Sequence, residues 1–208
     1  MSDKQIVLVA VRHGQTALNK NHCFRGSSNP PLDETGFKQA NTAGHYLKGL
    51  EIGEVYSSPK TRATQTADAI VRQTSSENYE TIDDLVALDV GNFSGQPKSP
   101  ENVAKIEQYI NNSQVPIPGG ESLDEFRGRV RPLFIEALKK WEQTGLPCLF
   151  VVHSSIIHEL GQMFNDDHHS ARVEPGGVSV VYLYDGELHA EPIFKPLQKA
   201  GNKVDTVS

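Results

Sequence analysis

Two runs of apolar residues along the chain end at a histidine. Residues 6–11 and residues 148–152 are apolar throughout, and Arg12-His13 follows the first run while His153 follows the second. Apolar runs without alternation are typical of strands buried on both faces of a parallel sheet. The carboxyl ends of such strands are where ligands bind in open α/β sheets. These two junctions are therefore the first candidate functional positions.

Segments with strand and helix patterns alternate along the rest of the chain. Further strands are predicted at 54–57, 81–90, 178–184 and 187–194, with Asp185-Gly186 as the tight turn between the last two. Helices are predicted at 36–50, 58–73, 122–144 and 154–164. Ser58-Pro59 is expected to begin the second helix, and Pro132 to bend or interrupt the third. The alternation predicts an α/β fold, a three-layer α/β/α sandwich with a mostly parallel central sheet.

The length of 208 residues fits a single domain over 1–208. The stretch 91–120 is irregular apart from a short helix near 103–110, and it is interpreted as a small lid or insertion over a binding site. A loose tail is expected from about residue 196.

Composition excludes several classes of function. The net charge of −6 argues against general binding to nucleic acids or anionic membranes. No apolar run approaches the roughly 20 residues of a membrane span, and the N-terminus lacks a signal-peptide pattern. Cys23 and Cys148 match neither a zinc nor a redox spacing. We therefore expect a cytoplasmic protein with free thiols.

Neighbouring strands would bring unusual chemistry to one edge of the sheet. Arg12, His13 and His153 follow two of the strands, and Arg62 lies just after a third. A neutral imidazole can attack phosphorus, and arginines match the oxygens of a phosphoryl group. This combination indicates phosphoryl transfer through a histidine.

The motifs around these residues extend over almost the whole chain. They are Arg12-His13-Gly14-Gln15-Thr16 with Asn19, Arg25-Gly26 with Pro31-Leu32, Gly36 with Gln39-Ala40, Ser57-Ser58 with Arg62-Ala63 and Gln65-Thr66-Ala67, Gly119-Gly120-Glu121-Ser122 with Arg129, and Val151-Val152-His153. Together they resemble the signature of the histidine phosphatase superfamily, the phosphoglycerate mutase-like proteins. The resemblance implies the α/β/α sandwich of that family.

The resemblance also implies roles for individual residues. His13 is the phosphorylated nucleophile, and Arg12, Arg62 and His153 complete the phosphate pocket. Asn19 and Arg25 are expected near that pocket. Gln15 and Ser154, which replace a commoner glutamate and glycine of the family, are candidates for substrate binding.

One departure concerns the general acid. Ala87 stands where the family usually has a glutamate, and Asp89 is two residues further on. Positions two apart share a face in an extended segment, so Asp89 is the candidate acid. An ordinary loop aspartate and a substrate that needs no protein acid, such as a phosphoramidate, are the alternatives.

The sequence thus predicts a metal-independent phosphatase that hydrolyses phosphate monoesters of small molecules through phospho-His13. The alternatives are a phosphoglycerate mutase-type phosphotransferase, a phosphohistidine or phosphoprotein phosphatase, and a catalytically idle phosphate-binding regulatory protein. No cofactor or metal is expected, because Asp166-Asp167-His168-His169 has no fixed ligand spacing and is interpreted as a solvated loop. No nucleic-acid or membrane partner is expected, and the sequence leaves the oligomeric state open.

Overall fold

The computed structural model describes residues 4–26, 28–74, 76 and 78–196. Within them, six strands form one sheet in the order β3-β2-β4-β1-β5-β6. β4 pairs in parallel with β1 and β2, and β2 pairs in parallel with β3, whereas β5 runs antiparallel to β1 and β6. The strands are β1 (Gln5–Arg12), β2 (Val55–Ser57), β3 (Glu80–Thr81), β4 (Cys148–Val152), β5 (Val178–Tyr184) and β6 (Glu187–Phe194). The predicted mostly parallel sheet is confirmed.

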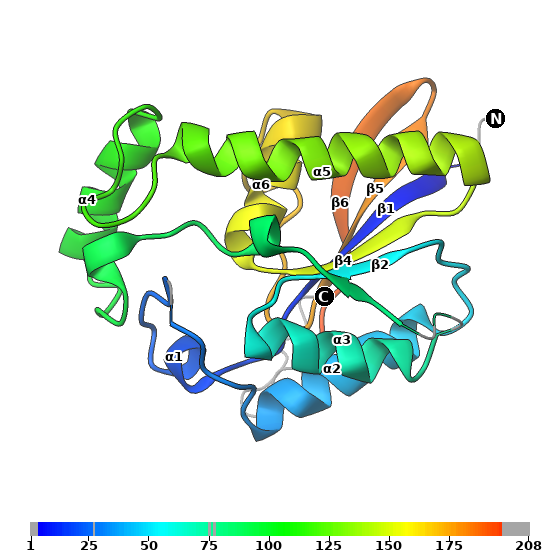
Figure 1. The fold of residues 1–208 in the computed structure, drawn as a ribbon, viewed down its shortest axis with the longest axis horizontal. Helices are drawn as coiled ribbons and strands as arrows, with labels where there is room; N and C mark the ends of the chain where they lie inside the picture. The colour runs from blue at the N-terminus through cyan, green and yellow to red at the C-terminus, as the bar shows by residue number, and fades with distance from the viewer. Residues whose placement is uncertain (1–3, 27, 75, 77, 197–208) are drawn as a thin grey trace, which may run out of the picture.

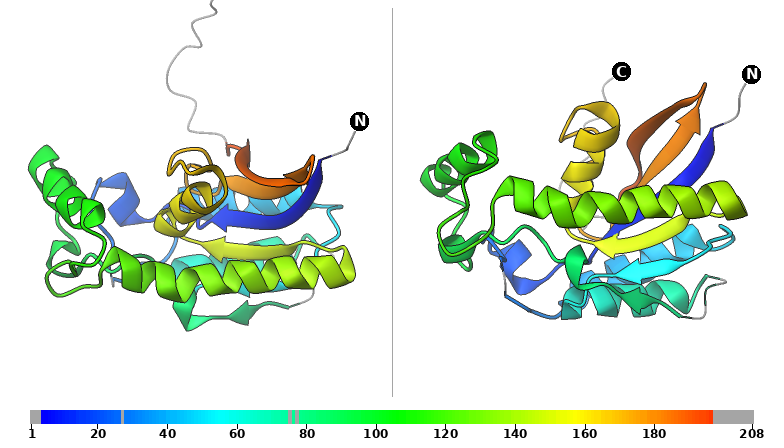
Figure 2. Two further views of the ribbon diagram at one scale, coloured as in Figure 1. Left: turned by 90° about the horizontal axis from the view of Figure 1, so that it is seen from above. Right: turned by 45° about the horizontal axis from the view of Figure 1, so that its top comes forward.

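Helices cover both faces of the sheet and complete the predicted three-layer sandwich (Figure 1). α5 and α6 pack on one face, and α2 and α3 on the other; Figure 2 shows the same layers from two further directions. The helices are α1 (Ala17–Lys20), α2 (Glu34–Leu47), α3 (Thr61–Val71), α4 (Pro100–Asn111), α5 (Leu123–Thr144) and α6 (Ser154–Asn165), with the 3₁₀ turns η1 (Asp83–Leu85) and η2 (Gly91–Phe93). No helix in the described residues combines the length and the apolarity that crossing a bilayer requires.

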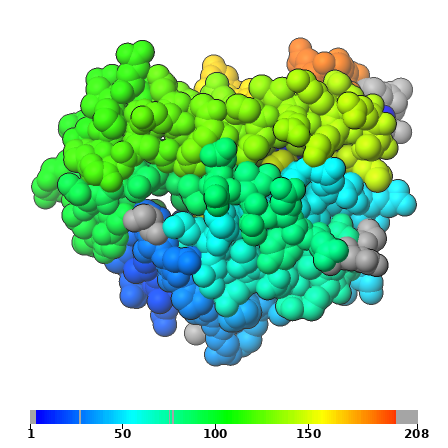
Figure 3. All heavy atoms as spheres, in the orientation of Figure 1, coloured from blue at the N-terminus to red at the C-terminus, as the bar shows by residue number. Residues whose placement is uncertain are grey.

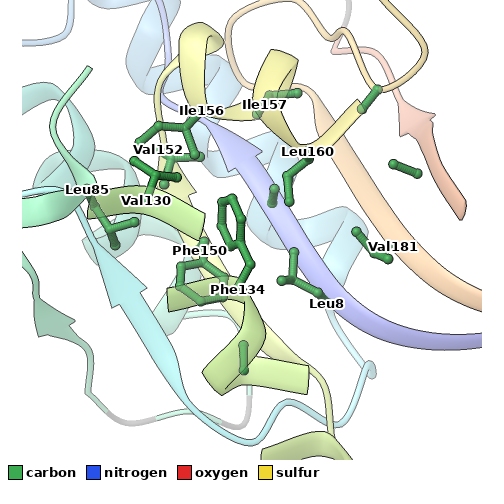
Figure 4. Close-up of a cluster of buried hydrophobic side chains, with 14 of the residues drawn as sticks. Leu8, Leu85, Val130, Phe134, Phe150, Val152, Ile156, Ile157, Leu160 and Val181 are labelled. Carbon is green, nitrogen blue, oxygen red and sulfur yellow. The ribbon is translucent and has the colours of Figure 1, made fainter. Parts of the chain in front are cut away.

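Alternate side chains of β1 pack into separate cores on the two faces of the sheet. Leu8 belongs to the core beneath α5 and α6, whereas Val9 belongs to the core beneath α2 and α3. In the first core, Phe134 of α5 meets Phe150 of β4 edge to face, with ring centroids 5.5 Å apart (Figure 4). Burial on both faces explains why the apolar runs show no alternation.

The segment between η1 and α5 contains more regular structure than predicted. α4 has 12 residues and begins after Ser99, whose hydroxyl accepts a hydrogen bond from the amide of Asn102. Val90, Ile106 and Ile117 form a small buried core of their own. This part of the chain occupies the left end of the molecule, the side toward which β1 and β4 run (Figures 1 and 3).

Two predicted elements differ because of contacts with distant parts of the chain. The strand expected over 81–90 is reduced to β3, and the carbonyls of Asp84, Val86 and Ala87 instead accept hydrogen bonds from the guanidinium of Arg129. The predicted helix 58–73 begins only at Thr61.

Helix α5 runs unbroken through Pro132, which lies on its exposed face. Water can there bond to the carbonyl left free by the missing N–H. The tail expected from about residue 196 falls almost wholly on 197–208, outside the described residues.

Candidate active site

Three parallel strands end side by side, and each is followed by a residue of the candidate site. The register pairs Arg12 with Val152, and Val151 with both Val11 and Ser57. His13, His153 and Ser58 therefore emerge at one edge of the sheet. The imidazole rings of His13 and His153 are 5.1 Å apart between centroids, at an interplanar angle of 63°. The two histidines, separated by some 140 positions along the chain, thus share one site as the sequence predicted.

The hydrogen bonds of His13 define which ring nitrogen carries the proton. Nδ1 lies 2.7 Å from the carbonyl oxygen of Gly14, which can only accept, so Nδ1 is the protonated nitrogen. The Nε–H of Arg62 donates to His13 Nε2 at 3.2 Å. Nε2 therefore holds the lone pair and faces the guanidinium.

Both imidazoles are fully buried, and their charged forms are strongly disfavoured. Burial is the main cause that lowers the pKa of His13 well below 6.5, and Arg25, His153, Arg62 and Arg12 lower it further. The pKa of His153 is lowered in the same way, by burial and then by the charges on Arg62 and Arg25. Both rings are neutral at pH 7, which is the state a nucleophilic imidazole requires.

Arg62 is placed by the first turn of α3 and is fully buried. Besides its bond to His13, its Nη1 donates to the carbonyl of Ser28 at 3.0 Å. Its Nη2 is buried without a hydrogen-bond partner among the described residues. Burial lowers the pKa of Arg62 to about 10, so the guanidinium stays charged at neutral pH. The Nη2 group of Arg62 is therefore the donor that remains for an anion.

Arg12 and Arg25 place two more guanidinium groups beside the histidines. Arg12 Nη1 donates to the carbonyl of Val173 at 2.8 Å, and Arg25 Nη2 donates to Ser154 Oγ at 3.4 Å. The Nε atoms of both arginines are buried and have no hydrogen-bond partner in the part of the chain that the structure describes. Burial is the first cause that lowers the pKa of each arginine to about 10. Glu174 opposes this effect only in part at Arg12, and a cluster of cations of this kind favours an oxyanion.

His153 is oriented by Ser58, a residue that the sequence analysis placed at a helix N-terminus instead. Ser58 Oγ lies 2.8 Å from His153 Nε2 and also accepts from the amide of Lys60 at 3.4 Å. The other ring nitrogen of His153, Nδ1, is buried and has no hydrogen-bond partner among the described residues. The position of Ser58 in the sequence could have indicated this role, because Ser58 directly follows β2 just as His13 and His153 directly follow β1 and β4.

Gln15 and Asn19 lie next to the arginines but are held by other contacts. The side-chain amide of Gln15 donates to Asp33 Oδ2 at 2.9 Å. Asn19 Oδ1 accepts from the backbone N–H and the hydroxyl of Thr16 at 3.1 and 2.9 Å. Asn19 thereby completes the capping box in which Thr16 is the N-cap of α1. Both residues line a cavity together with Arg12 and Arg25.

Among the described residues, the hydrogen bonds of Asp89 join it to neither histidine. Its carboxylate accepts a hydrogen bond from the amide of Gly91 at 3.0 Å, and its own amide donates to Glu121 Oε1 at 2.8 Å. Glu121 is itself paired with Arg129 at 2.6 Å. No group of three or more histidine, cysteine or acidic side chains able to hold a metal lies within the described residues, residues 166–169 included.

Comparison with known proteins identifies the family. The sequence model of the histidine phosphatase superfamily (branch 1) matches residues 8–193, which include His13, Arg62 and His153. This chain belongs to the histidine phosphatase superfamily. It is 33% identical to the 2,3-bisphosphoglycerate-dependent phosphoglycerate mutase of Brucella anthropi over 161 residues, 74% of this chain and 78% of that one. The enzyme of that name from Methylorubrum extorquens is 31% identical over 162 residues, 74% of this chain and 76% of that one.

Solved structures of the superfamily share the fold. A phosphoglycerate mutase from Bacillus anthracis superposes with a TM-score of 0.74 at 26% identity, over 92% of this chain and 94% of the other. A mycobacterial glucosyl-3-phosphoglycerate phosphatase in complex with VO3 gives a TM-score of 0.76 at 21% identity, over 91% and 99% of the two chains; at that identity it shows the fold alone. The family membership and these relatives support an enzyme of the phosphatase and phosphomutase kind.

Proposed function

We propose that this chain hydrolyses phosphate monoesters of small molecules through a phosphohistidine on His13, without a metal. The observation that carries the proposal is the lone pair at His13 Nε2. The bond from Nδ1 to Gly14 keeps Nε2 unprotonated, and the hydrogen bond that Nε2 accepts from Arg62 Nε–H must give way when a phosphoryl group enters. Because the ring is neutral at pH 7, no proton has to be removed before Nε2 attacks phosphorus.

In the first step, the bond from Nε2 to phosphorus forms and the bond from phosphorus to the leaving oxygen breaks. The donors for the non-bridging oxygens are the buried N–H groups of Arg62, Arg12 and Arg25 that have no partner among the described residues, together with His153 Nδ1 when that nitrogen carries the ring proton. In the second step, water attacks phosphorus and the nitrogen–phosphorus bond breaks. Inorganic phosphate leaves and His13 returns to its neutral state. Positioning and charge stabilisation by these donors supply most of the catalysis.

We keep Asp89 as the candidate group that protonates the leaving oxygen. To act, Asp89 must first take up a proton, and the resulting carboxylic acid must exchange the hydrogen bond with the Gly91 amide for one that it donates to the leaving oxygen. The test compares Asp89→Asn on an alkyl phosphate and on p-nitrophenyl phosphate. A general acid matters more for the poorer leaving group, so kcat/KM should fall far more for the alkyl ester. Equal effects on both substrates would remove Asp89 from this role.

The hydrogen bond between the Asp89 carboxylate and the Gly91 amide favours a second candidate function, a phosphoramidate hydrolase, because such an enzyme does not depend on Asp89 as an acid. The bond from phosphorus to nitrogen in phosphohistidine needs less help from a protein acid than an alkyl ester does. Hydrolysis of a phosphohistidine peptide that is unaffected by Asp89→Asn, together with negligible alkyl phosphatase activity, would select this function.

The mutase alternative differs only in the fate of the phosphohistidine. A mutase returns the phosphoryl group to a bound product, whereas a phosphatase gives it to water. The segment between η1 and α5 contains one α-helix, α4, and we interpret this segment as a small lid over the site. A small lid favours hydrolysis over return of the phosphoryl group to a bound product. The curated relatives named as phosphoglycerate mutases make the opposite outcome worth testing directly.

The deciding experiment follows p-nitrophenyl phosphate and 3-phosphoglycerate in excess EDTA, with His13→Ala as the matched inactive variant. Release of nitrophenol and inorganic phosphate that requires His13 and is insensitive to EDTA supports the phosphatase. Conversion of 3-phosphoglycerate to 2-phosphoglycerate without phosphate release would establish a mutase. Binding of phosphate without turnover of any ester or phosphoramidate would leave the idle regulatory protein.

Both cysteines of the chain are free thiols, as is usual in a reducing compartment, and this supports the proposed cytoplasmic location.

A further inference from the structure

Cys23 is a free, partly exposed thiol on the wall of the cavity beside the histidine site. This cavity has a volume of about 520 Å³, and its lining also includes Arg12, Arg25, Lys98 and Arg172. The thiol takes no part in the proposed mechanism. A chemical group attached to its sulfur would nevertheless lie among these cations and close to the phosphoryl site.

The other cysteine of the chain, Cys148, has the opposite surroundings. It lies in β4 and is 1% exposed, and burial is the main cause that raises the pKa of its thiol. Reactive cysteines are typically partly exposed and close to cations, whereas cysteines buried in apolar surroundings are inert. Cys23 is therefore the candidate for modification, and Cys148 is its internal control.

The charges in the cavity indicate which kind of reagent reaches Cys23. Glu174 is the one carboxylate among the lining residues. The Nε atoms of Arg12 and Arg25 are buried and have no hydrogen-bond partner among the described residues. Buried donors of charged groups are costly to leave without an acceptor, and a carboxylate is the acceptor that suits a guanidinium best. These unpartnered donors are independent of the thiol, and they favour an anionic reagent.

The backbone around Cys23 is tied to the segment that leads into α4. The amide of Lys98 donates to the carbonyl of His22 at 2.8 Å, and Cys23 lies opposite Pro97 in an antiparallel bridge. Arg25 follows Cys23 by two positions. A group attached to Cys23 would therefore be held beside both Arg25 and Lys98.

We propose that Cys23 is a site of reversible modification by an anionic disulfide of the glutathione class, and that the adduct closes the cavity to the substrate. The Cys23 thiol loses its proton and the sulfur attacks one sulfur of the disulfide. The new sulfur–sulfur bond forms as the old one breaks, and the released thiolate takes up a proton. Cys23 is thereby oxidised and the disulfide is reduced, and an excess of a free thiol reverses the exchange.

The adduct and the substrate compete for the same donors. Glutathione carries more carboxylates than amino groups, and those carboxylates would bond to the guanidinium groups of Arg12 and Arg25, which the proposed mechanism assigns to the phosphoryl oxygens. Phosphate then binds less tightly, and turnover falls. The loss of turnover rests on the proposed function, whereas the modification of Cys23 and the loss of phosphate binding do not.

The first test measures how fast the folded protein takes up one glutathionyl group, by intact-mass spectrometry with peptide mapping of both cysteines. Glutathione disulfide is compared with cystamine, a disulfide that carries amino groups and no carboxylate. Each rate is divided by the rate for the same cysteine in the chain unfolded in urea. We expect the normalised rate at Cys23 to be roughly tenfold higher for glutathione disulfide than for cystamine. Raising the ionic strength from about 0.05 M to about 0.5 M should reduce this ratio.

Two substitutions of cations test the role of the cavity. Lys98→Met should reduce the ratio of the two rates several-fold, because it removes a charge from the cavity wall. Arg72→Met is the matched control, because Arg72 is exposed at the far end of α3, and it should keep the wild-type ratio. Folded Cys23→Ser should take up no glutathionyl group.

The second test measures what the adduct does to the site. The dissociation constant of inorganic phosphate, determined by calorimetry, should rise by about tenfold or more in the glutathionylated protein, as the loss of one charge-assisted hydrogen bond predicts. The value of kcat/KM for p-nitrophenyl phosphate should fall in parallel, and dithiothreitol should restore both. The same treatment should change neither quantity in Cys23→Ser, with untreated Cys23→Ser as the reference.

Three results would overturn the proposed site: Cys23 stays unmodified in the folded protein, Cys148 reacts faster than Cys23, or the two normalised rates at Cys23 are equal. An adduct at Cys23 that leaves the affinity for phosphate unchanged would refute closure of the cavity. If the untreated protein hydrolyses no ester, the proposed function fails, and the modification rates with the phosphate affinities still decide this inference separately.

Discussion

Replacing Arg62 with lysine tests the geometry of the site while keeping its charge. The guanidinium donates from Nε to His13 and from Nη1 to the carbonyl of Ser28, and its Nη2 remains for a phosphoryl oxygen. A lysine ammonium is a single point and does not reproduce this planar fork. Arg62→Lys is therefore expected to lose one or two charge-assisted hydrogen bonds in the transition state.

Each such bond contributes about 1.5–3 kcal/mol. At about 1.36 kcal/mol per tenfold in rate, the loss of one bond predicts a roughly 10- to 150-fold fall in kcat/KM, and the loss of two a fall of about 10²–10⁴. The assay is the hydrolysis of p-nitrophenyl phosphate at pH 7 in EDTA. Because Arg62 is fully buried, thermal unfolding of the variant must show that it is folded at the assay temperature.

Arg72→Lys, at the exposed end of the same helix, is the control and should retain wild-type kcat/KM. A folded Arg62→Lys variant whose kcat/KM lies within about threefold of wild type would show that the fork is not used. A comparable fall in Arg72→Lys would show that the loss is a general effect on α3 and not a loss at the site.

Three further predictions concern stability and are all measured by urea unfolding. Gly14→Ala should lower the free energy of unfolding by about 1–3 kcal/mol, because the new Cβ would lie 2.4 Å from a backbone carbonyl oxygen of α2. Gly128→Ala is the control: its Cβ meets open space, so the variant should raise the free energy of unfolding by about 0.5–1 kcal/mol. Equal effects of the two substitutions would refute this prediction. Phe134→Ala should cost about 3–5 kcal/mol, since its ring is fully buried; a loss under about 1 kcal/mol would contradict the packing. Burial lowers the pKa of His158 to about 4 from 6.5, so the unfolded chain binds the extra proton and the free energy of unfolding should decrease as pH falls from 6.5 to about 4. His158→Gln should flatten this decrease by up to about 1.4 kcal/mol per pH unit, and an unchanged slope would exclude His158 as its source.

The architecture was predictable because its signals are local. Residues 148–152 are apolar throughout because β4 is buried on both faces, and Ser122 with Glu125 forms the capping box that begins α5. The turn at Asp185-Gly186 likewise joins β5 to β6. In each case a few neighbouring side chains are enough to select the backbone conformation.

The errors lie where a distant residue competes for a local group. The Ser58 hydroxyl accepts a long hydrogen bond from the amide of Lys60, but its shorter hydrogen bond is with His153, and α3 begins only at Thr61. In the strand expected over 81–90, backbone carbonyls accept hydrogen bonds from Arg129 in place of hydrogen bonds from a neighbouring strand. Neither partner is near in the sequence, so pattern alone could not reveal the competition.

The sequence by itself determined the family, the mostly parallel sheet and the edge of that sheet at which Arg12, His13 and His153 emerge, because these follow from apolar runs and the residues directly after them. Only the tertiary structure decided which nitrogen of His13 holds the lone pair, that the Asp89 carboxylate is bonded to a backbone amide, and that Lys98 and Arg172 line the cavity shared by Arg12 and Arg25. The physical reason is that hydrogen-bond partners and unpaired charge depend on which loops the fold brings together, and those loops are far apart along the chain.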